Sequence, residues 1–235
     1  MEHLLTALTH AAQDGGWTRL PTGMLTPENL ALPDKEGYAA IHYAAYSGTL
    51  HTLPKHMLTV RNMTLLAPSR MSPYTLLRRH EVVGLNLDSI PESLRKQIKH
   101  YRRHEDPRPI IERLRDCAQC GDWSDMPKEI LIPANSSLKD PANGCNPLFY
   151  AAQDERFRFV PKHMITEEAM VARVQFIEDR EYPWEGNALG LALNEEWSHV
   201  PMEIIQKHWD SLNPIQQEMI TAELHEMFPN SMELS

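Results

Sequence analysis

Large apolar residues recur at fixed offsets from six prolines that are spaced about 33 to 40 residues apart. The prolines are Pro21, Pro54, Pro91, Pro127, Pro161 and Pro201. Four positions before each proline stands a large apolar residue: Trp17, Leu50, Leu87, Trp123, Phe157 and Trp197. The position before each proline and the third position after it are apolar as well. This period is typical of a stacked array of repeats, whereas an irregular helical bundle with scattered prolines is the alternative.

The clearest repeat unit lies at residues 34–58. A tight turn is predicted at its start, where Gly37 can adopt a positive φ. A short helix follows and ends at Gly48, and Pro54 is placed to begin a second helix. The first helix is predicted to have one apolar face, formed by residues at helical spacing, namely Ile41, Ala44 and Ala45. The unit therefore reads as turn, helix, turn, helix.

Residues 34–50, with the pattern D-x-x-G-x-x-x-I-H-x-A-A-x-x-G-x-L, resemble the ankyrin repeat, whose signature is T-P-L-H-x-A-A. Residues 146–152, NPLFYAA, are similar to a second copy, and 9–16 and 114–123 are looser copies. Two departures are the Ala39-Ala40 pair in place of Thr-Pro and the proline inside each second helix, which is expected to shorten that helix. The resemblance implies an all-α, ankyrin-like helical solenoid of about six repeats.

The array is predicted to divide at a basic helix. Unit three is the weakest repeat, because His80 and Glu81 replace the small Ala-Ala pair. After Pro91 the helix is predicted to run to about His104, before two prolines end it. We therefore expect repeats one to three in residues 1–109 and repeats four to six in residues 110–235. The second part is expected to end in an amphipathic capping helix whose apolar face holds Ile215, Met219, Ile220, Leu224 and Met227.

Charge is distributed unevenly along the chain, whose formal net charge is −9. Residues 78–115 carry an excess of basic side chains, whereas residues 116–235 alone sum to about −13. The basic set consists of Arg95, Lys96, Lys99, Arg102, Arg103 and Arg108. It could bind phosphate or an acidic partner, or form a solvated face that pairs with the acidic half. Nucleic acid is not the favoured partner, because one short basic helix in an acidic chain is a weak footprint.

No catalytic motif is recognised, so no enzymatic activity and no cofactor are expected, and an enzyme with a site not visible in the sequence is the alternative. Cys117 and Cys120 form C-x-x-C, and Cys145 with His163 would complete a zinc set. However, Cys117 falls in a core column, so packing as small apolar side chains is expected instead. A structural role in the turn is expected for His42. The acidic clusters at 154–155, 179–181 and 195–196 are interpreted as solvated.

The chain is expected to be cytoplasmic. No apolar run approaches the length of a membrane span, and the first residues lack the basic start and apolar core of a signal peptide. Three cysteines without an export signal favour a reducing compartment. We expect a monomer that does not associate with membranes.

The resemblance also implies where a partner protein binds. In ankyrin repeats the turn tips and the exposed side of each first helix line a concave face. In unit two this maps to Lys35, Glu36, Tyr38, Tyr46 and Ser47, and in unit five to Ala142, Asn143, Cys145, Gln153 and Asp154. Tyr38 and Tyr46 are the expected anchors, unless both rings only cover the neighbouring repeat. Arg102 and Arg103 on the basic helix form the rival site.

The function expected from these observations is binding of another protein. The alternative is an acidic inhibitor or nucleic-acid mimic, whose acidic half would block a basic cleft on a nuclease or similar target. High salt is expected to weaken a mimic steeply.

Overall fold

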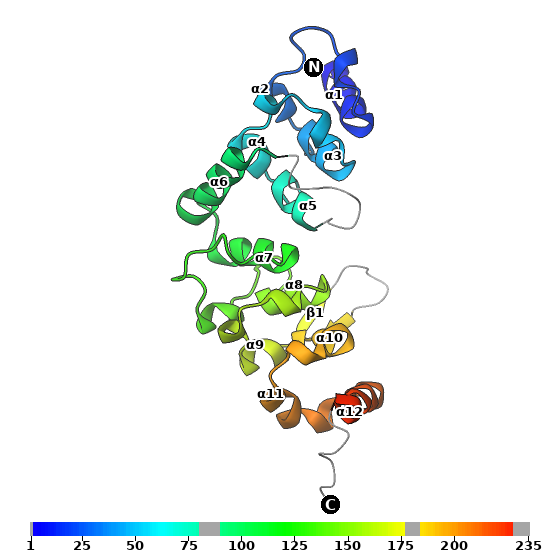
Figure 1. Ribbon diagram of the computed structural model, residues 1–235, viewed down its shortest axis with the longest axis vertical. Helices are drawn as coiled ribbons and strands as arrows, with labels where there is room; N and C mark the ends of the chain where they lie inside the picture. The colour runs from blue at the N-terminus through cyan, green and yellow to red at the C-terminus, as the bar shows by residue number, and fades with distance from the viewer. Residues whose placement is uncertain (1, 80–89, 177–183, 228–235) are drawn as a thin grey trace, which may run out of the picture. The chain divides into compact units, whose positions relative to one another are not determined.

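The computed structural model describes residues 2–79, 90–176 and 184–227 and is mostly helical (Figure 1). The chain divides into two compact units, Met1–Pro107 and Arg108–Ser235. Each unit has its own cluster of buried apolar side chains. No helix among the described residues is long and apolar enough to span a membrane.

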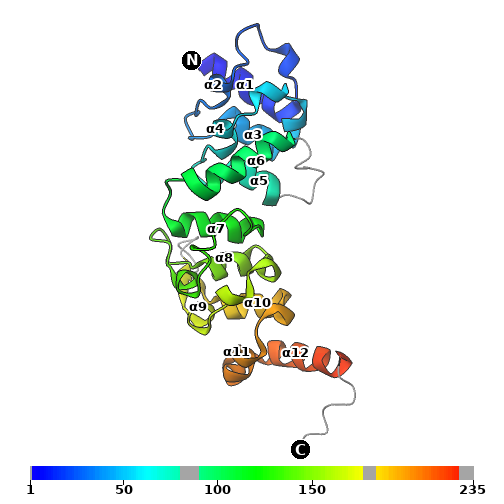
Figure 2. The same ribbon diagram turned by 60° about the vertical axis from the view of Figure 1, so that its left-hand side comes forward.

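In the first compact unit, Met1–Pro107, the first helices of successive repeats stack on one another. Each of these helices is followed by short helical turns. In the stack α3 packs against both α1 and α5 (Figures 1 and 2). The elements are α1 (Glu2–Asp14), η1 (Trp17–Arg19), α2 (Pro27–Leu30), α3 (Ala40–Tyr46), η2 (Thr49–Thr52), η3 (Lys55–Met57), α4 (Val60–Thr64), α5 (Pro73–Arg79), α6 (Glu92–His100) and the π-helical turn η6 (Tyr101–Glu105).

The second unit repeats this arrangement, with α8 packed between α7 and α10 (Figure 2). Its elements are α7 (Ile110–Cys120), η7 (Pro133–Ser137), α8 (Pro147–Gln153), η8 (Phe157–Phe159), η9 (Lys162–Met164), α9 (Glu167–Val171), β1 (Val174–Phe176), β2 (Trp184–Gly186), α10 (Ala188–Glu195), η10 (Trp197–His199), α11 (Met202–Lys207), η11 (Trp209–Ser211) and α12 (Pro214–Met227). The two strands pair antiparallel, with Val174 opposite Gly186. This hairpin was not predicted.

The apolar columns face the core. In the first column Trp17, Leu50, Trp123, Phe157 and Trp197 are buried, and Leu87 lies outside the described residues. In the column before each proline, Leu53, Ile90, Met126, Val160 and Val200 are buried, and Leu20 is half-buried. In the third column Met57, Leu94, Met164 and Ile204 are buried, and Met24 and Ile130 are half-buried. Burial of these columns follows from their apolar character.

In units one, two and five the second helix does not begin at the column proline, whereas in units three and six α6 and α11 begin directly after Pro91 and Pro201. Pro54 leads into only a single 3-10 turn, η3, and the helix α4 begins after Thr59. The Thr59 hydroxyl caps that helix by accepting the Asn62 N–H at 3.2 Å. Thr26 and Thr166 cap α2 and α9 in the same way. The second helices α2, α4 and α9 are therefore only four or five residues long.

An asparagine eight positions after the column proline makes the same hydrogen bond in three units. The side-chain amides of Asn29, Asn62 and Asn135 donate to the carbonyls of Met24, Met57 and Ile130 respectively. In each case the bond gives the backbone carbonyl three positions after the proline a side-chain donor. This bond supports the repeat register independently of the apolar columns.

Units one and two correspond closely to units four and five, residue by residue. Gly15 and Gly121 both end a first helix in the left-handed conformation, with φ of 73° and 70°. Two residues later come Trp17 and Trp123. The offset between the two copies is about 106 residues, and it grows by one within the turn that begins at Asp34 in the first copy. Units four and five are therefore a second copy of units one and two, and unit three lies between the two copies.

Two other predictions need correction, and two concern residues outside the described part of the chain. On the C-terminal helix Ile220 is fully buried, but Ile215 is 78 % exposed, because the buried Gln216 takes the contact with α10 by donating to Gly190 O and Asn194 Oδ1. Glu196 is also buried, not solvated, since its carboxylate accepts the Phe157 N–H at 2.5 Å. His80, Glu81 and residues 179–181 lie outside the described residues.

Candidate partner-binding site

The turn at residues 34–38 forms a rigid tip around one carboxylate. Asp34 Oδ1 accepts the N–H groups of Glu36 and Tyr38 at 2.9 and 3.0 Å, and Oδ2 accepts the Tyr43 hydroxyl at 2.7 Å. Burial alone would raise the pKa of Asp34, but these donors lower it below its usual value. Burial, with the neighbouring carboxylate, raises the pKa of Tyr43 to about 12. The tip therefore carries a fixed negative charge.

His42 fastens this turn to the second helix of its unit. Nδ1 accepts the Ala39 N–H at 3.1 Å, and Nε2 donates to the Leu65 carbonyl at 2.9 Å. The ring is 2 % exposed. Burial lowers the pKa of His42, and the neutral ring is the form that makes both bonds. The structural role predicted for this residue matches these contacts.

Acid is expected to destabilise the chain through His42. The unfolded histidine takes up a proton below about pH 6.5, whereas the buried ring stays neutral until the pH reaches its lower folded pKa. Because the unfolded state then binds more protons, stability falls as the pH drops through this window. Urea unfolding at about pH 7.5 and about pH 5.5 should show a smaller acid loss for His42→Gln than for the wild type. An equal loss in both proteins would remove His42 as the cause.

Four of the predicted contact residues line one groove beside the tip, which we call the tyrosine groove. Its volume is about 410 Å³. It is lined by Gln13, Glu36, Tyr38, His42, Tyr43, Tyr46, Ser47, Ser69, Met71 and Leu76. Tyr46 is 69 % exposed, which does not fit a ring that only covers the next repeat. Tyr38 is half-buried and packs edge-on against His42, with 6.2 Å between the ring centroids.

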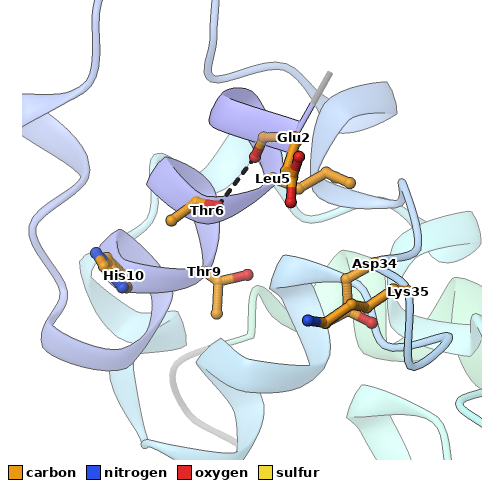
Figure 3. Close-up of a pocket in the computed structure, with 7 residues that line it drawn as sticks. All are labelled: Glu2, Leu5, Thr6, Thr9, His10, Asp34 and Lys35. Atoms are coloured by element: carbon orange, nitrogen blue, oxygen red, sulfur yellow. Dashed lines mark hydrogen bonds between the residues drawn. The ribbon is translucent and has the colours of Figure 1, made fainter.

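The fifth residue, Lys35, lies on the other side of the tip. It lines a second pocket, of about 450 Å³, between α1 and the turn (Figure 3). Thr6 and Thr9 contribute from the facing side of α1. The tip is thus a ridge between two hollows, and the residues predicted for unit two lie on both of its flanks.

The corresponding turn in unit five is held more tightly. Asp140 is fully buried and accepts the Ala142 N–H, the Tyr150 hydroxyl and the Arg115 guanidinium. Of the residues predicted here, Asn143 is half-buried and accepts the Cys145 N–H and the Tyr150 hydroxyl at 3.0 Å each.

Burial changes which unit-five residues can contact a partner. Cys145 is fully buried and cannot do so, which corrects that prediction. Gln153 is exposed, at the position equivalent to Tyr46, and Asp154 is half-buried. Ala142, at the tip, is exposed.

The rival basic site is smaller than predicted. Arg102 is only 3 % exposed, and its guanidinium lies 5.5 Å from the centre of the Tyr74 ring. A buried arginine cannot meet a partner, so Arg102 is removed from the candidate surface. Arg103, like Lys99, is exposed. The helix ends at Glu105, one residue beyond the predicted position.

The cysteines pack in the core of the second unit. Cys117 and Cys145 are fully buried, and Cys120 is 8 % exposed. Burial raises the pKa of Cys145 to about 12, so its thiol is protonated. His163, the fourth member of the hypothetical zinc set, bonds to the Leu131 carbonyl instead. In the part of the chain that the structure describes, no three His, Cys, Asp or Glu residues are grouped to hold a metal.

The buried Arg115–Asp140–Tyr150 cluster was missed at the level of sequence. Arg115 Nη1 lies 2.6 Å from Asp140 Oδ2, and the guanidinium lies 6.0 Å from the centre of the Tyr150 ring. A signal was present, because both turns contain an aspartate followed nine or ten residues later by a tyrosine. Asp34 with Tyr43 is the first such pair, and Asp140 with Tyr150 is the second.

Comparison of the chain with protein-family models, with curated proteins and with solved structures finds no match.

Proposed function

We propose that the chain is an ankyrin-like helical solenoid that binds another protein through its turn tips and the exposed faces of its first helices, without catalysis. Support comes from the likeness of residues 34–50 and 146–152 to the ankyrin signature. The stacked first helices and the recurring asparagine bond are consistent with a repeat array.

The tyrosine groove carries the proposal. It combines two tyrosine rings with the polar groups of Glu36 and Ser47 at a tip that is rigid before any partner arrives. Tyrosine gives a large contact area and a polar end at low entropic cost, and a rigid turn loses little freedom on binding. Within the second unit, Gln153 and Asp154 occupy the positions equivalent to Tyr46 and Ser47.

The acidic-mimic alternative is less well supported. Asp116 and Asp140 are buried and pair with Arg108 and Arg115, and Glu196 is buried as a cap of η8. The negative charge presented at the surface is therefore smaller than the sequence sum. Binding that weakens steeply from low to high salt would favour the mimic.

A double substitution in the tyrosine groove tests the proposal. Tyr38→Ala with Tyr46→Ala is expected to weaken binding of the partner recovered by affinity purification by at least about tenfold, since tyrosine anchors are common binding hot spots. The melting temperature should change little, because Tyr46 is exposed.

The matched control reverses charge on the basic helix at Lys99 and Arg103, both of which are exposed. Arg102 is left unchanged in this control, because it is buried and its substitution would disturb folding. The control protein should bind the partner normally. If it loses the partner while the tyrosine variant keeps it, the binding site lies on the basic helix instead.

A further inference from the structure

The two copies of the turn differ at one position that faces the central aspartate. Counting back six residues from the left-handed glycine that ends each first helix gives Arg115 in α7 and Thr9 in α1. In the second unit Arg115 fills the space between helix and turn and binds Asp140 at 2.6 Å. In the first unit the short Thr9 leaves that space open, and a pocket of about 450 Å³ lies there.

The open pocket keeps the equivalent of the aspartate that Arg115 binds. Asp34 and Thr9 both line it (Figure 3). Asp34 Oδ2 accepts the Tyr43 hydroxyl, as Asp140 Oδ2 accepts that of Tyr150. Asp140 Oδ2 also accepts the guanidinium, whereas among the described residues the donors to the Asp34 carboxylate are two backbone N–H groups and the Tyr43 hydroxyl. The second unit therefore shows what chemistry the pocket of the first unit is built to take.

We propose that the pocket between α1 and the Asp34 turn binds an arginine side chain of the partner protein. The inserted guanidinium takes the place that Arg115 occupies in the second unit and donates to Asp34, which also accepts the Tyr43 hydroxyl. This assignment rests on the proposed function, because it names the chemistry of the group that the partner presents.

Electrostatics and shape favour arginine over other side chains. Asp34 is held ionised by its hydrogen bonds, and Glu2 adds a second carboxylate to a lining whose basic side chains are Lys35 and His10. Arginine is planar, stays charged and packs well against aromatic rings, whereas lysine is a strongly hydrated point charge. The chain itself places arginines over Tyr74 and Tyr150.

The test uses the full chain and a short blocked peptide with one arginine, Ac-Gly-Arg-Gly-NH2, titrated by two-dimensional NMR. Saturable shifts are expected for the backbone amides of Glu36 and Tyr38, which report on the Asp34 carboxylate. The lysine peptide should bind several-fold more weakly, because it lacks the planar fork. Lys35→Ala should tighten binding of the arginine peptide, because it removes the like charge.

Thr9→Arg is the decisive variant. It supplies the guanidinium from within the chain, as Arg115 does, so it should raise the melting temperature and abolish the shifts caused by the peptide. His3→Arg, at an exposed position of α1 that does not line the pocket, is the matched control and should leave peptide binding intact. The same variants, applied to the captured partner, should show a loss of at least about tenfold for Thr9→Arg only.

Several results would overturn the inference. They are the absence of shifts at millimolar peptide, equal shifts in wild type and Thr9→Arg, and equal binding of the lysine peptide. Free arginine that binds far more tightly than the peptide would show a small-molecule site instead. If Thr9→Arg leaves partner binding unchanged while the Tyr38 and Tyr46 substitutions abolish it, the arginine pocket is wrong but the proposed function stands. If neither affects partner binding, the proposed face is wrong.

Discussion

Replacing Asp140 with alanine is expected to lower the free energy of unfolding by about 3–5 kcal/mol, the usual cost of breaking a buried ion pair from one side. The side chains of Arg115 and Asp140 are 7 % and 0 % exposed. The substitution leaves the arginine charge buried without its counter-ion. It also removes the acceptor of the Ala142 N–H and one acceptor of the Tyr150 hydroxyl.

The equivalent substitution at Asp34 is the internal control. Asp34 is half-buried and holds the same kind of turn, but Thr9 stands where Arg115 would be. Asp34→Ala should therefore cost only about 1–2 kcal/mol, the range for lost hydrogen bonds without a stranded charge. Urea unfolding measures both variants. Equal losses at the two positions would show that the Arg115 pair does not distinguish the two copies.

Replacing Trp197 with alanine is expected to cost about 3–5 kcal/mol, as the loss of a large buried aromatic side chain does. Trp197 is 6 % exposed, sits in the first apolar column, and donates its indole N–H to Glu223 on α12 at 2.7 Å. The cavity would lie under the last repeat. A loss below about 1 kcal/mol would mean that the column is not a core position.

Phenylalanine substitutions separate packing from hydrogen bonding at these tryptophans. Trp197→Phe keeps an aromatic ring but loses the bond to Glu223. Trp123 is buried too, and its indole nitrogen has no hydrogen-bond partner among the residues that the structure describes. Trp123→Phe should therefore cost less than Trp197→Phe, since it removes a buried N–H that is already unsatisfied. The order of the two midpoints in urea checks this expectation.

The periodic features of the fold were predictable from the sequence. Apolar columns such as Trp17, Leu50 and Trp123 recur at fixed offsets, and burial follows from that pattern because each repeat must cover the same surface. The turn at Asp34 and the end of a helix at Gly48 rest on local backbone preferences. The tip residues Lys35 and Tyr46 were placed by resemblance to a repeat, and whether they bind a partner remains a prediction.

Other features depend on contacts between residues distant in sequence, which periodicity does not contain. Arg102 belongs to a run of basic residues, yet it is buried over Tyr74, which lies on the first helix of the same repeat. The sequence suggests that Glu196 is a solvated acid, whereas in the structure its carboxylate accepts the N–H of Phe157. In both cases a specific partner offsets the cost of burying a charge, and only the structure shows where that partner lies.

Hydrogen–deuterium exchange with and without the captured partner tests the central claim most directly, because it maps the bound surface on the whole chain. We predict slower exchange at residues 35–38, 46–48 and 69–71, which border the tyrosine groove, and at 153–154 in the second unit. Residues 95–105 on the basic helix should exchange at an unchanged rate. Protection confined to residues 95–105, with the turn tips unaffected, would contradict the account.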